Sequence, residues 1–136
     1  MEKIKGIGRN GRGPGEFINP LSVFNNGKNL YVNDAGNFRF HHFYDDSLVS
    51  TTNYSKSINE FIVYEKNYIT YIDDPSFQNQ NSLFTVLNEQ GEVVKKFGDE
   101  LSLFEQANRS INRPILKIYG NNLYVLFRYY PILRIY

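Results

Sequence analysis

Three glycines near the N-terminus have the spacing of a phosphate-binding loop. Gly6, Gly8 and Gly11 satisfy G-x-G-x-x-G, in which backbone N–H groups hold the pyrophosphate of a dinucleotide. That fingerprint requires a strand before the loop and a helix after it, because the helix N-terminus faces the phosphate. Here Pro14 and Pro20 follow the glycines, and a strand pattern resumes without a helix. We therefore expect the glycines to supply positive φ angles at a sharp turn of the chain.

The other residues that could do chemistry do not form a catalytic or metal-binding constellation. His41 and His42 are the only histidines, and adjacent residues of a strand point to opposite faces, so they do not share one metal ion. Asp45-Asp46 and Asp73-Asp74 indicate turns, whereas a glycosidase needs two carboxylates that face one bond. The chain has no cysteine, which excludes thiolate chemistry. We therefore predict no metal site, no cofactor and no catalytic residue.

Length and charge limit the class of protein. The 136 residues suit one domain, and the formal net charge of +1 favours neither nucleic acid nor an anionic membrane. Lys3, Lys5, Arg9 and Arg12 make the N-terminal stretch basic, but no aromatic residues lie between them, so no nucleic-acid partner is predicted. No apolar run approaches the ~20 residues of a membrane helix, and the first residues lack the apolar segment of a signal peptide.

Composition and alternation predict a succession of short β-strands. Tyr and Phe each occur 11 times and Asn is abundant, which disfavours helices and favours strands joined by turns. Strands are predicted at residues 3–8, 20–24, 29–34, 38–44, 48–52, 60–64, 68–73, 83–87, 93–97, 115–119, 122–127 and 132–136. One short helix is predicted at residues 100–107.

These strands form three copies of one repeat. Residues 29–32, Asn-Leu-Tyr-Val, recur as residues 122–125, and Pro20 recurs as Pro114. The same superposition matches Arg39 with Arg134, and a more divergent copy lies between them. Half the separation of the outer copies is about 47 residues, which suits the four-stranded repeats of propellers. One such sheet cannot bury both of its faces, so the repeats are expected to stack around an axis.

The connector and the strand that follows it carry a family pattern, IG-x-x-G-x-GPGEF-x-x-P and then LYV-x-D-x-x-N-x-R. The first copy fits it with Ile7, Gly8, Gly11, Gly13, Pro14, Gly15, Glu16, Phe17, Pro20, Leu30, Tyr31, Val32, Asp34, Asn37 and Arg39. The third copy keeps Phe97, Gly98, Pro114, Leu123, Tyr124, Val125 and Arg134, with Phe127 in the place of Asp34. The chain thus resembles the NHL-repeat and TolB-like six-bladed β-propellers of bacteria. The resemblance implies an all-β fold whose blades are four-stranded antiparallel sheets.

The chain supplies about half of such a propeller, because six blades of this period need about twice its length. We expect a single partial domain over residues 1–136, with an outer strand at 3–8, a first blade at 17–54, a second at 58–98 and an incomplete third at 112–136. Two explanations stay open. The chain is a fragment of a longer protein, or two copies form a homodimer in which the first strand of each completes the last blade of the other.

The blade topology places the connectors on the same rim as the loops between second and third strands. The predicted binding residues on this rim are Arg9, Arg12, Glu16, Asp34, Asn37, Asp73 and Asp74. A structural explanation competes for three residues, because Asp34, Arg39 and Arg134 suit a stitch between strands that each blade requires.

The function we expect is a non-enzymatic scaffold that binds a protein partner or associates with itself. The alternatives are a part of a propeller enzyme, such as a metal-dependent lactonase or a lyase whose other blades carry the site, and a gene remnant without activity. The innermost strands favour the scaffold, because they are largely apolar and an enzyme needs carboxylates that converge on the axis. Relatives are commonly periplasmic or lipoproteins, yet this chain shows no export signal, so the compartment stays open.

Overall fold

The computed structural model describes residues 6–71, 82–99, 114–127 and 132–136. The predicted helix at 100–107, residues 3–5 of the predicted first strand, and the predicted rim residues Asp73 and Asp74 lie outside these ranges. The strands are β1 (Arg9–Asn10), β2 (Glu16–Phe17), β3 (Pro20–Asn26), β4 (Asn29–Asp34), β5 (Arg39–Tyr44), β6 (Ser47–Asn53), β7 (Glu60–Tyr64), β8 (Asn67–Tyr71), β9 (Ser82–Leu87), β10 (Val93–Asp99), β11 (Pro114–Tyr119), β12 (Asn122–Phe127) and β13 (Leu133–Ile135). Among the described residues, no helix is long and apolar enough to cross a membrane.

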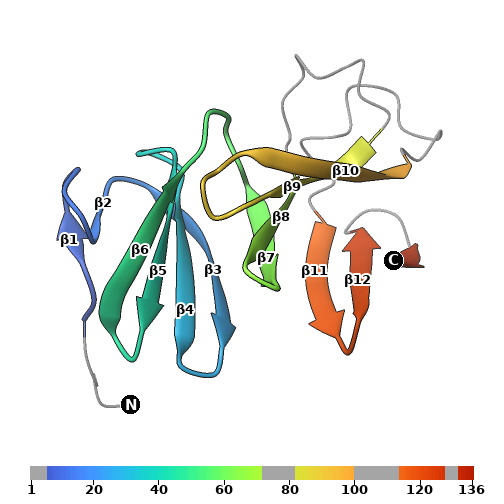
Figure 1. Cartoon of the computed structure of the whole chain (residues 1–136), viewed down its shortest axis with the longest axis horizontal. Coiled ribbons are helices and arrows are strands. Elements are labelled where there is room, and N and C mark those ends of the chain that lie inside the picture. Colours follow the sequence, from blue (N-terminus) through green and yellow to red (C-terminus); the bar gives the residue numbers. More distant parts are fainter. Residues whose placement is uncertain (1–5, 72–81, 100–113, 128–131) are drawn as a thin grey trace.

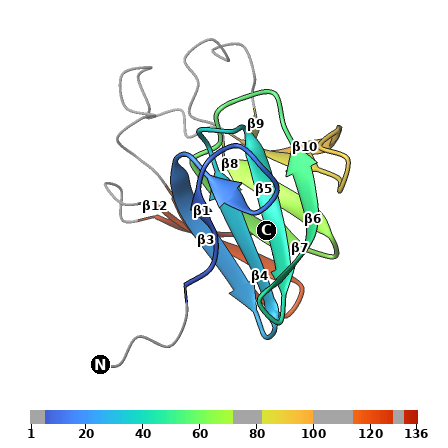
Figure 2. The ribbon, with the colours of Figure 1, turned by 90° about the vertical axis from the view of Figure 1, so that its left-hand side faces the viewer.

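Three antiparallel sheets make up the bulk of the described chain, as the repeats predict. The first sheet has the order β3-β4-β5-β6, the second β7-β8-β9-β10 and the third β11-β12-β13, so consecutive strands are neighbours throughout. Figure 1 shows the sheets in a row, with β1 at one end and β12 at the other, and Figure 2 looks along this row from the β1 end. We call the face of each sheet that points toward the next sheet along the chain its front face, and the opposite face its back face.

Two-residue turns set a common register for the three sheets. Asn26 pairs with Asn29, Tyr64 with Asn67, and Tyr119 with Asn122, so the first two strands of each sheet are joined in the same way. In the second sheet the turn residues, 65 and 66, both have positive φ, which matches the twist of a tight hairpin. These turns allow positions in one sheet to be compared directly with positions in another.

The hydrophobic core lies between the sheets in two clusters. Between the first and second sheets the buried residues are Phe40, Tyr54, Ile58, Phe61, Val63, Tyr68 and Leu87. Between the second and third they are Ile62, Ile69, Tyr71, Phe84, Val86, Leu123, Val125 and Phe127. Alternate residues of β7 enter different clusters, because successive strand side chains point to opposite faces. The middle sheet is therefore covered on both sides.

The predicted first strand differs from the structure. Its described part, residues 6–8, lies in no sheet. The chain becomes a strand only at β1, which pairs in parallel with β2 across the connector. A strand needs a hydrogen-bonded neighbour, and residues 6–8 pair with none of the described strands.

Candidate functional site

The glycine-rich connector folds around the side chain of Glu16. Its carboxylate accepts hydrogen bonds from the Gly13 N–H at 2.6 Å and from Arg9 Nε at 2.7 Å. These two donors, the Gly13 N–H first, hold the pKa of Glu16 below its usual value. A Cβ at Gly11 would overlap the same carboxylate, and Gly11 has φ +153°. The glycines therefore allow a turn to close on a carboxylate, and the next elements after them are β2 and β3 rather than a helix.

Asp34 joins this connector to the loop between β4 and β5. The residue is fully buried. Its Oδ1 accepts hydrogen bonds from the backbone N–H groups of Ile18 at 3.1 Å and Asn19 at 2.9 Å, and its Oδ2 accepts one from the Asn37 amide at 2.6 Å. Arg39 Nε lies 3.8 Å from Oδ2. Both carboxylate oxygens are thus occupied by internal partners, which is the geometry of a structural stitch.

Arg39 extends the stitch to the other side of the connector. Its guanidinium donates to the backbone carbonyl oxygens of Arg12, Gly13 and Glu16, each at 2.9 Å. Asn37 also donates to the connector, at the Gly11 carbonyl oxygen. Asp34, Asn37 and Arg39 therefore hold the connector through hydrogen bonds to its backbone groups between residues 11 and 19.

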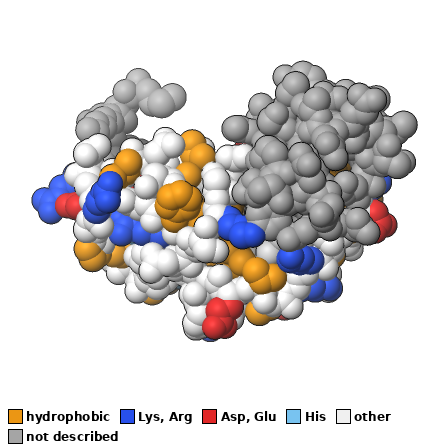
Figure 3. All heavy atoms as spheres, turned by 90° about the horizontal axis from the view of Figure 1, so that it is seen from above, with side chains coloured by type: hydrophobic (Ala, Val, Ile, Leu, Met, Phe, Trp, Pro, Cys, Tyr) orange, Lys and Arg blue, Asp and Glu red, His pale blue; other side chains and the backbone are white. Residues whose placement is uncertain are grey.

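The structure brings five of the predicted rim residues together, and two hydrophobic residues that the sequence analysis missed lie beside them. The five are Arg9, Arg12, Glu16, Asp34 and Asn37. Glu16, Asp34 and Asn37 point into the connector, whereas the Arg12 side chain is exposed and makes no ion pair among the described residues. Ile18 is 40% exposed and Phe38 is 48% exposed on the same loops. Figure 3 views this rim from above and shows Lys and Arg side chains among hydrophobic ones on its described part.

The predicted match of Arg134 with Arg39 is wrong by two residues. Arg134 pairs with Val125, the counterpart of Val32, whereas Arg39 pairs with Asp34. Arg134 also donates to backbone, because its Nη1 is hydrogen-bonded to the carbonyl oxygen of Asp99, the last residue of β10, at 2.6 Å. It contacts backbone there without the aspartate that accompanies Arg39.

A buried polar link between the first two sheets was also missed by the sequence analysis. Asn33 is fully buried, and its side-chain amide donates to the Ile58 carbonyl oxygen at 2.8 Å. Tyr54 donates its hydroxyl hydrogen to Asn33 Oδ1 at 2.5 Å. Burial is the main reason that the pKa of Tyr54 lies well above its usual value. The available sign was a polar residue, Asn33, on the same face of the strand as Tyr31 and opposite Phe40 of the next strand, both of which face the core.

The two histidines face opposite sides of the first sheet and do not form a joint site. His41 is fully buried on the back face, with its ring edge-on to Phe17 at 5.1 Å and its Nδ1 3.2 Å from the Thr51 hydroxyl. Its Nε2 has no hydrogen-bond partner among the described residues. His42 stacks on Tyr31 at 4.3 Å on the front face. Burial lowers the pKa of both imidazoles, so both are neutral packing groups near pH 7.

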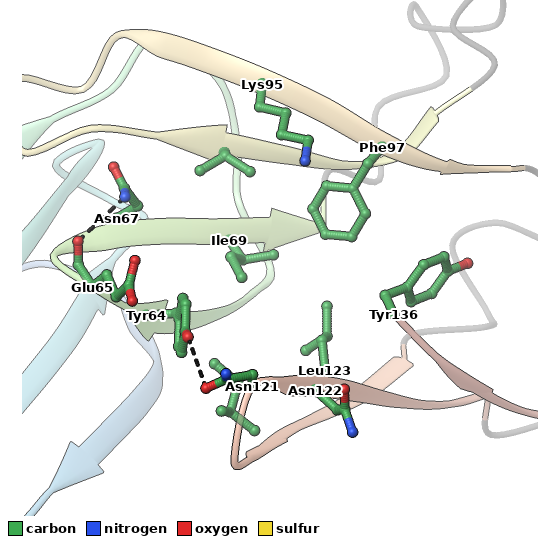
Figure 4. A pocket seen from close by; sticks show the side chains of 12 residues that line it. Tyr64, Glu65, Asn67, Ile69, Lys95, Phe97, Asn121, Asn122, Leu123 and Tyr136 are labelled. Atoms are coloured by element: carbon green, nitrogen blue, oxygen red, sulfur yellow. Dashed lines mark hydrogen bonds between the residues drawn. The ribbon is translucent and has the colours of Figure 1, made fainter.

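A groove of about 590 Å³ separates the outer parts of the second and third sheets (Figure 4). Its lining residues are Tyr64, Glu65, Asn67, Ile69, Val86, Lys95, Phe97, Ile118, Asn121, Asn122, Leu123 and Tyr136. Tyr64 crosses the groove to donate to Asn121 Oδ1 at 3.4 Å. Lys95 Nζ lies 5.8 Å from the centre of the Phe97 ring. The groove is mainly aromatic and aliphatic, with one cation and one carboxylate.

A second recess, of about 570 Å³, lies where the turns after the innermost strands β3, β7 and β11 converge. Glu65 and Lys117 are its charged lining residues. Among the residues that the structure describes, no three His, Asp or Glu side chains lie close enough to hold a metal ion.

Comparisons with known proteins place this architecture in a family. The family model DUF5128, described as a six-bladed β-propeller, matches residues 3–136. The fold is similar to the crystal structure of a "putative exported protein" from Bacteroides fragilis, with a TM-score of 0.66 and 14% sequence identity. The match covers 91% of this chain and 36% of that protein, so this chain spans about a third of its length. No curated protein matches significantly.

Proposed function

This chain belongs to the six-bladed β-propeller family whose model matches its residues 3–136, and we propose that it is a non-enzymatic scaffold. We propose that this scaffold binds a protein partner on its connector rim. The resemblance of the connector to those of NHL-repeat and TolB-like propellers supports the same proposal. The partner segment we propose is an acidic peptide with a hydrophobic anchor.

Phe38 is the observation that carries this proposal. Its φ is +53°, a left-handed conformation that costs a side chain other than Gly, Asn or Asp about 1 kcal/mol or more. The backbone is fixed there because the Tyr54 N–H donates to the Phe38 carbonyl oxygen at 2.9 Å. The strained residue nevertheless presents an aromatic ring that is about half exposed. Strain of this kind is concentrated at functional sites, which supports a binding role for the ring.

Charge on the rim supports an acidic, proteinaceous ligand. The Arg12 side chain is exposed without a counter-charge among the described residues, on the same rim as the exposed hydrophobic Ile18 and Phe38. Arg and aromatic side chains dominate the binding energy of protein interfaces. Nucleic acid is disfavoured because Arg9, the other described cation of the connector, is paired with Glu16 at 2.7 Å.

The test selects peptides from a random display library on the immobilised protein, then measures the affinity of the best synthetic peptide by fluorescence anisotropy. We expect acidic peptides with one aromatic or aliphatic residue. Phe38→Asn removes the ring but keeps a residue that tolerates positive φ, so it weakens binding about tenfold or more without loss of folding. Arg12→Ala acts in the same direction.

The matched controls lie at the opposite end of the first sheet. Tyr44 is 49% exposed, and Lys28 Nζ lies 5.9 Å from its ring centre. Tyr44→Asn and Lys28→Ala therefore remove an equally exposed aromatic residue and one cation from the same sheet, and they leave the affinity unchanged. A selection without enriched peptides, or peptides whose affinity is the same in the Phe38 and Tyr44 variants, would overturn the proposal.

A further inference from the structure

The sequence contains two Asn-Gly pairs, Asn10-Gly11 in the connector and Asn26-Gly27 in the turn between β3 and β4. In such a pair the backbone nitrogen of the glycine can attack the side-chain amide carbon of the asparagine. Glycine favours this attack because it has no Cβ to hinder the approach and its backbone rotates freely. Both asparagines are exposed, so the sequence and exposure alone do not distinguish the two pairs.

The fold restrains the pair in the connector. The Gly11 N–H, which belongs to the attacking nitrogen, donates to the Phe17 carbonyl oxygen at 3.0 Å. The Gly11 carbonyl oxygen accepts a hydrogen bond from the Asn37 amide at 3.1 Å. Attack on the Asn10 side chain requires rotation of the peptide group that joins residues 10 and 11. That rotation would break the bond to Phe17 and disturb the bond from Asn37, so the closed connector opposes it.

The pair in the turn has weaker restraints. The Gly27 N–H donates no hydrogen bond within the described part of the chain. Gly27 has φ +63°, and no atom lies within 4 Å of the place that a Cβ would occupy. The side-chain bonds across the turn are long and exposed, with the Asn25 amide 3.3 Å from the Gly27 carbonyl oxygen and the Asn29 amide 3.4 Å from the Asn26 carbonyl oxygen. The end of a strand ladder frays readily, so this turn gives the nitrogen room to move.

We propose that Asn26 is a site of spontaneous modification, at which the Gly27 nitrogen closes a cyclic imide on the Asn26 side chain and water opens the imide to a carboxylate. The nitrogen forms a bond to Cγ and gives up its proton, while the Cγ–Nδ2 bond breaks and ammonia leaves. Water then cleaves one of the two C–N bonds of the imide. Cleavage at Cγ gives aspartate, and cleavage at the original peptide bond gives isoaspartate. The reaction consumes one water and releases one ammonia, with no change of oxidation state.

Both products change the first sheet and the recess beside it. Asn26 pairs with Asn29 at the turn, which lies at the end of the sheet away from β1 and β2 (Figure 1). Isoaspartate adds one carbon to the main chain there, so it disturbs the register that the turn sets. Asn26 also lines the recess that contains Glu65 and Lys117, and either product adds a carboxylate to this lining. The modification therefore makes the recess more acidic and lowers the formal net charge of the chain by one unit.

The difference in restraint sets the expected difference in rate. Attack at Asn26 must release the last backbone pair of a ladder, between Asn26 and Asn29. Attack at Asn10 must release the Gly11 N–H and loosen the bond from the Asn37 amide, within a connector that is also held by Arg39. One additional hydrogen bond to break corresponds to a reaction about tenfold slower. We therefore expect Asn26 to react at least about tenfold faster than Asn10 in the folded chain.

Peptide mapping by mass spectrometry tests this proposal on the purified 136-residue chain, incubated at 37 °C in mildly alkaline buffer. The replacement of an amide NH2 by OH raises the peptide mass, and mapping assigns the change to residue 10 or residue 26. Methylation by a protein isoaspartyl methyltransferase shows which fraction is isoaspartate. We expect both aspartate and isoaspartate at position 26, while position 10 keeps its amide over the same period.

Two controls connect the rates to the fold. In concentrated urea both pairs lose their restraints, and we expect them to react at similar rates. Gly27→Asn keeps a residue that tolerates positive φ but adds a side chain that hinders the attack, so it slows the reaction at Asn26 and leaves Asn10 unchanged. Asn37→Ala removes the hydrogen bond to the Gly11 carbonyl oxygen, so it accelerates the reaction at Asn10 and leaves Asn26 unchanged. Circular dichroism confirms that both variants are folded.

An unmodified Asn26 in a folded chain whose Asn26 reacts in urea would overturn the proposal, because the turn would then restrain the nitrogen. A folded chain in which Asn10 reacts as fast as Asn26 would overturn it as well. Neither outcome depends on the proposed binding of a peptide to the rim, since the assay contains no ligand and the turn is at the other end of the first sheet.

Discussion

Removal of the Asp34 carboxylate is the most direct test of the stitch that shapes the rim. Asp34→Ala leaves the backbone N–H groups of Ile18 and Asn19 and the amide of Asn37 without their acceptor. Each unsatisfied donor costs about 1 kcal/mol. It also leaves Arg39, whose side chain is only 12% exposed, without its counter-charge, and the loss of one partner from a buried pair costs about 3–5 kcal/mol in all. We therefore expect a loss of about 4 kcal/mol in the free energy of unfolding, a large part of the total of a small domain.

Urea denaturation followed by circular dichroism, at one fixed protein concentration, measures this loss. Asp34→Asn keeps the Oδ1 acceptor but places an amide N–H2 group, which is a donor, opposite the Asn37 and Arg39 donors. We therefore expect it to lower the free energy of unfolding by about half as much as Asp34→Ala. Lys28→Ala is the control, because the Lys28–Asp45 pair at 3.3 Å is exposed on both sides and contributes about 0.5 kcal/mol. If Asp34→Ala costs less than about 1 kcal/mol, the carboxylate does not hold the connector and the reasoning fails.

Three further predictions concern the connector and the buried titrating groups. Gly11→Ala forces a Cβ into the Glu16 carboxylate and lowers unfolding stability by about 1–3 kcal/mol in the same urea assay. Burial lowers the pKa of His41, so the unfolded chain takes up a proton before the folded chain as pH falls below about 6.5. The free energy of unfolding therefore declines from pH 7 to 5, and His41→Gln reduces that decline. Burial raises the pKa of Tyr54, so the unfolded chain loses this proton before the folded chain above about pH 10. The free energy of unfolding therefore declines there, and Tyr54→Phe reduces the decline. Urea titrations at pH 9 and 11 measure this difference.

The strands and their grouping were predictable because the relevant information is local. Alternation in residues 60–64 and the turns after Asn26 and Tyr119 fix where strands begin and end, and the repeats fix which strands share a sheet. The position of Arg12, Glu16 and Asn37 on one rim followed from topology alone. Alternation could not indicate which polar groups form hydrogen bonds within the chain. Such bonds join residues that are 15 or more positions apart in the sequence, as Asn19 and Asp34 are.

Three failures have specific physical causes. The match of Arg134 with Arg39 failed because identical residues were aligned without the cross-strand register, and a shift of two residues keeps the same face. The strand predicted at residues 3–8 failed in its described part because a strand needs a neighbour, and residues 6–8 pair with none of the described strands. Phe38 was missed because its importance lies in a backbone conformation that Phe rarely adopts.

The two end sheets are held to the row in different ways. The first sheet carries the full stitch of Asp34 and Arg39, which fixes its connector and the ring of Phe17 over the back face. The third sheet has the buried Phe127 in the place of Asp34, so its attachment depends on packing against the second sheet. The first connector therefore depends on buried polar contacts, whereas the attachment of the third sheet depends on hydrophobic burial.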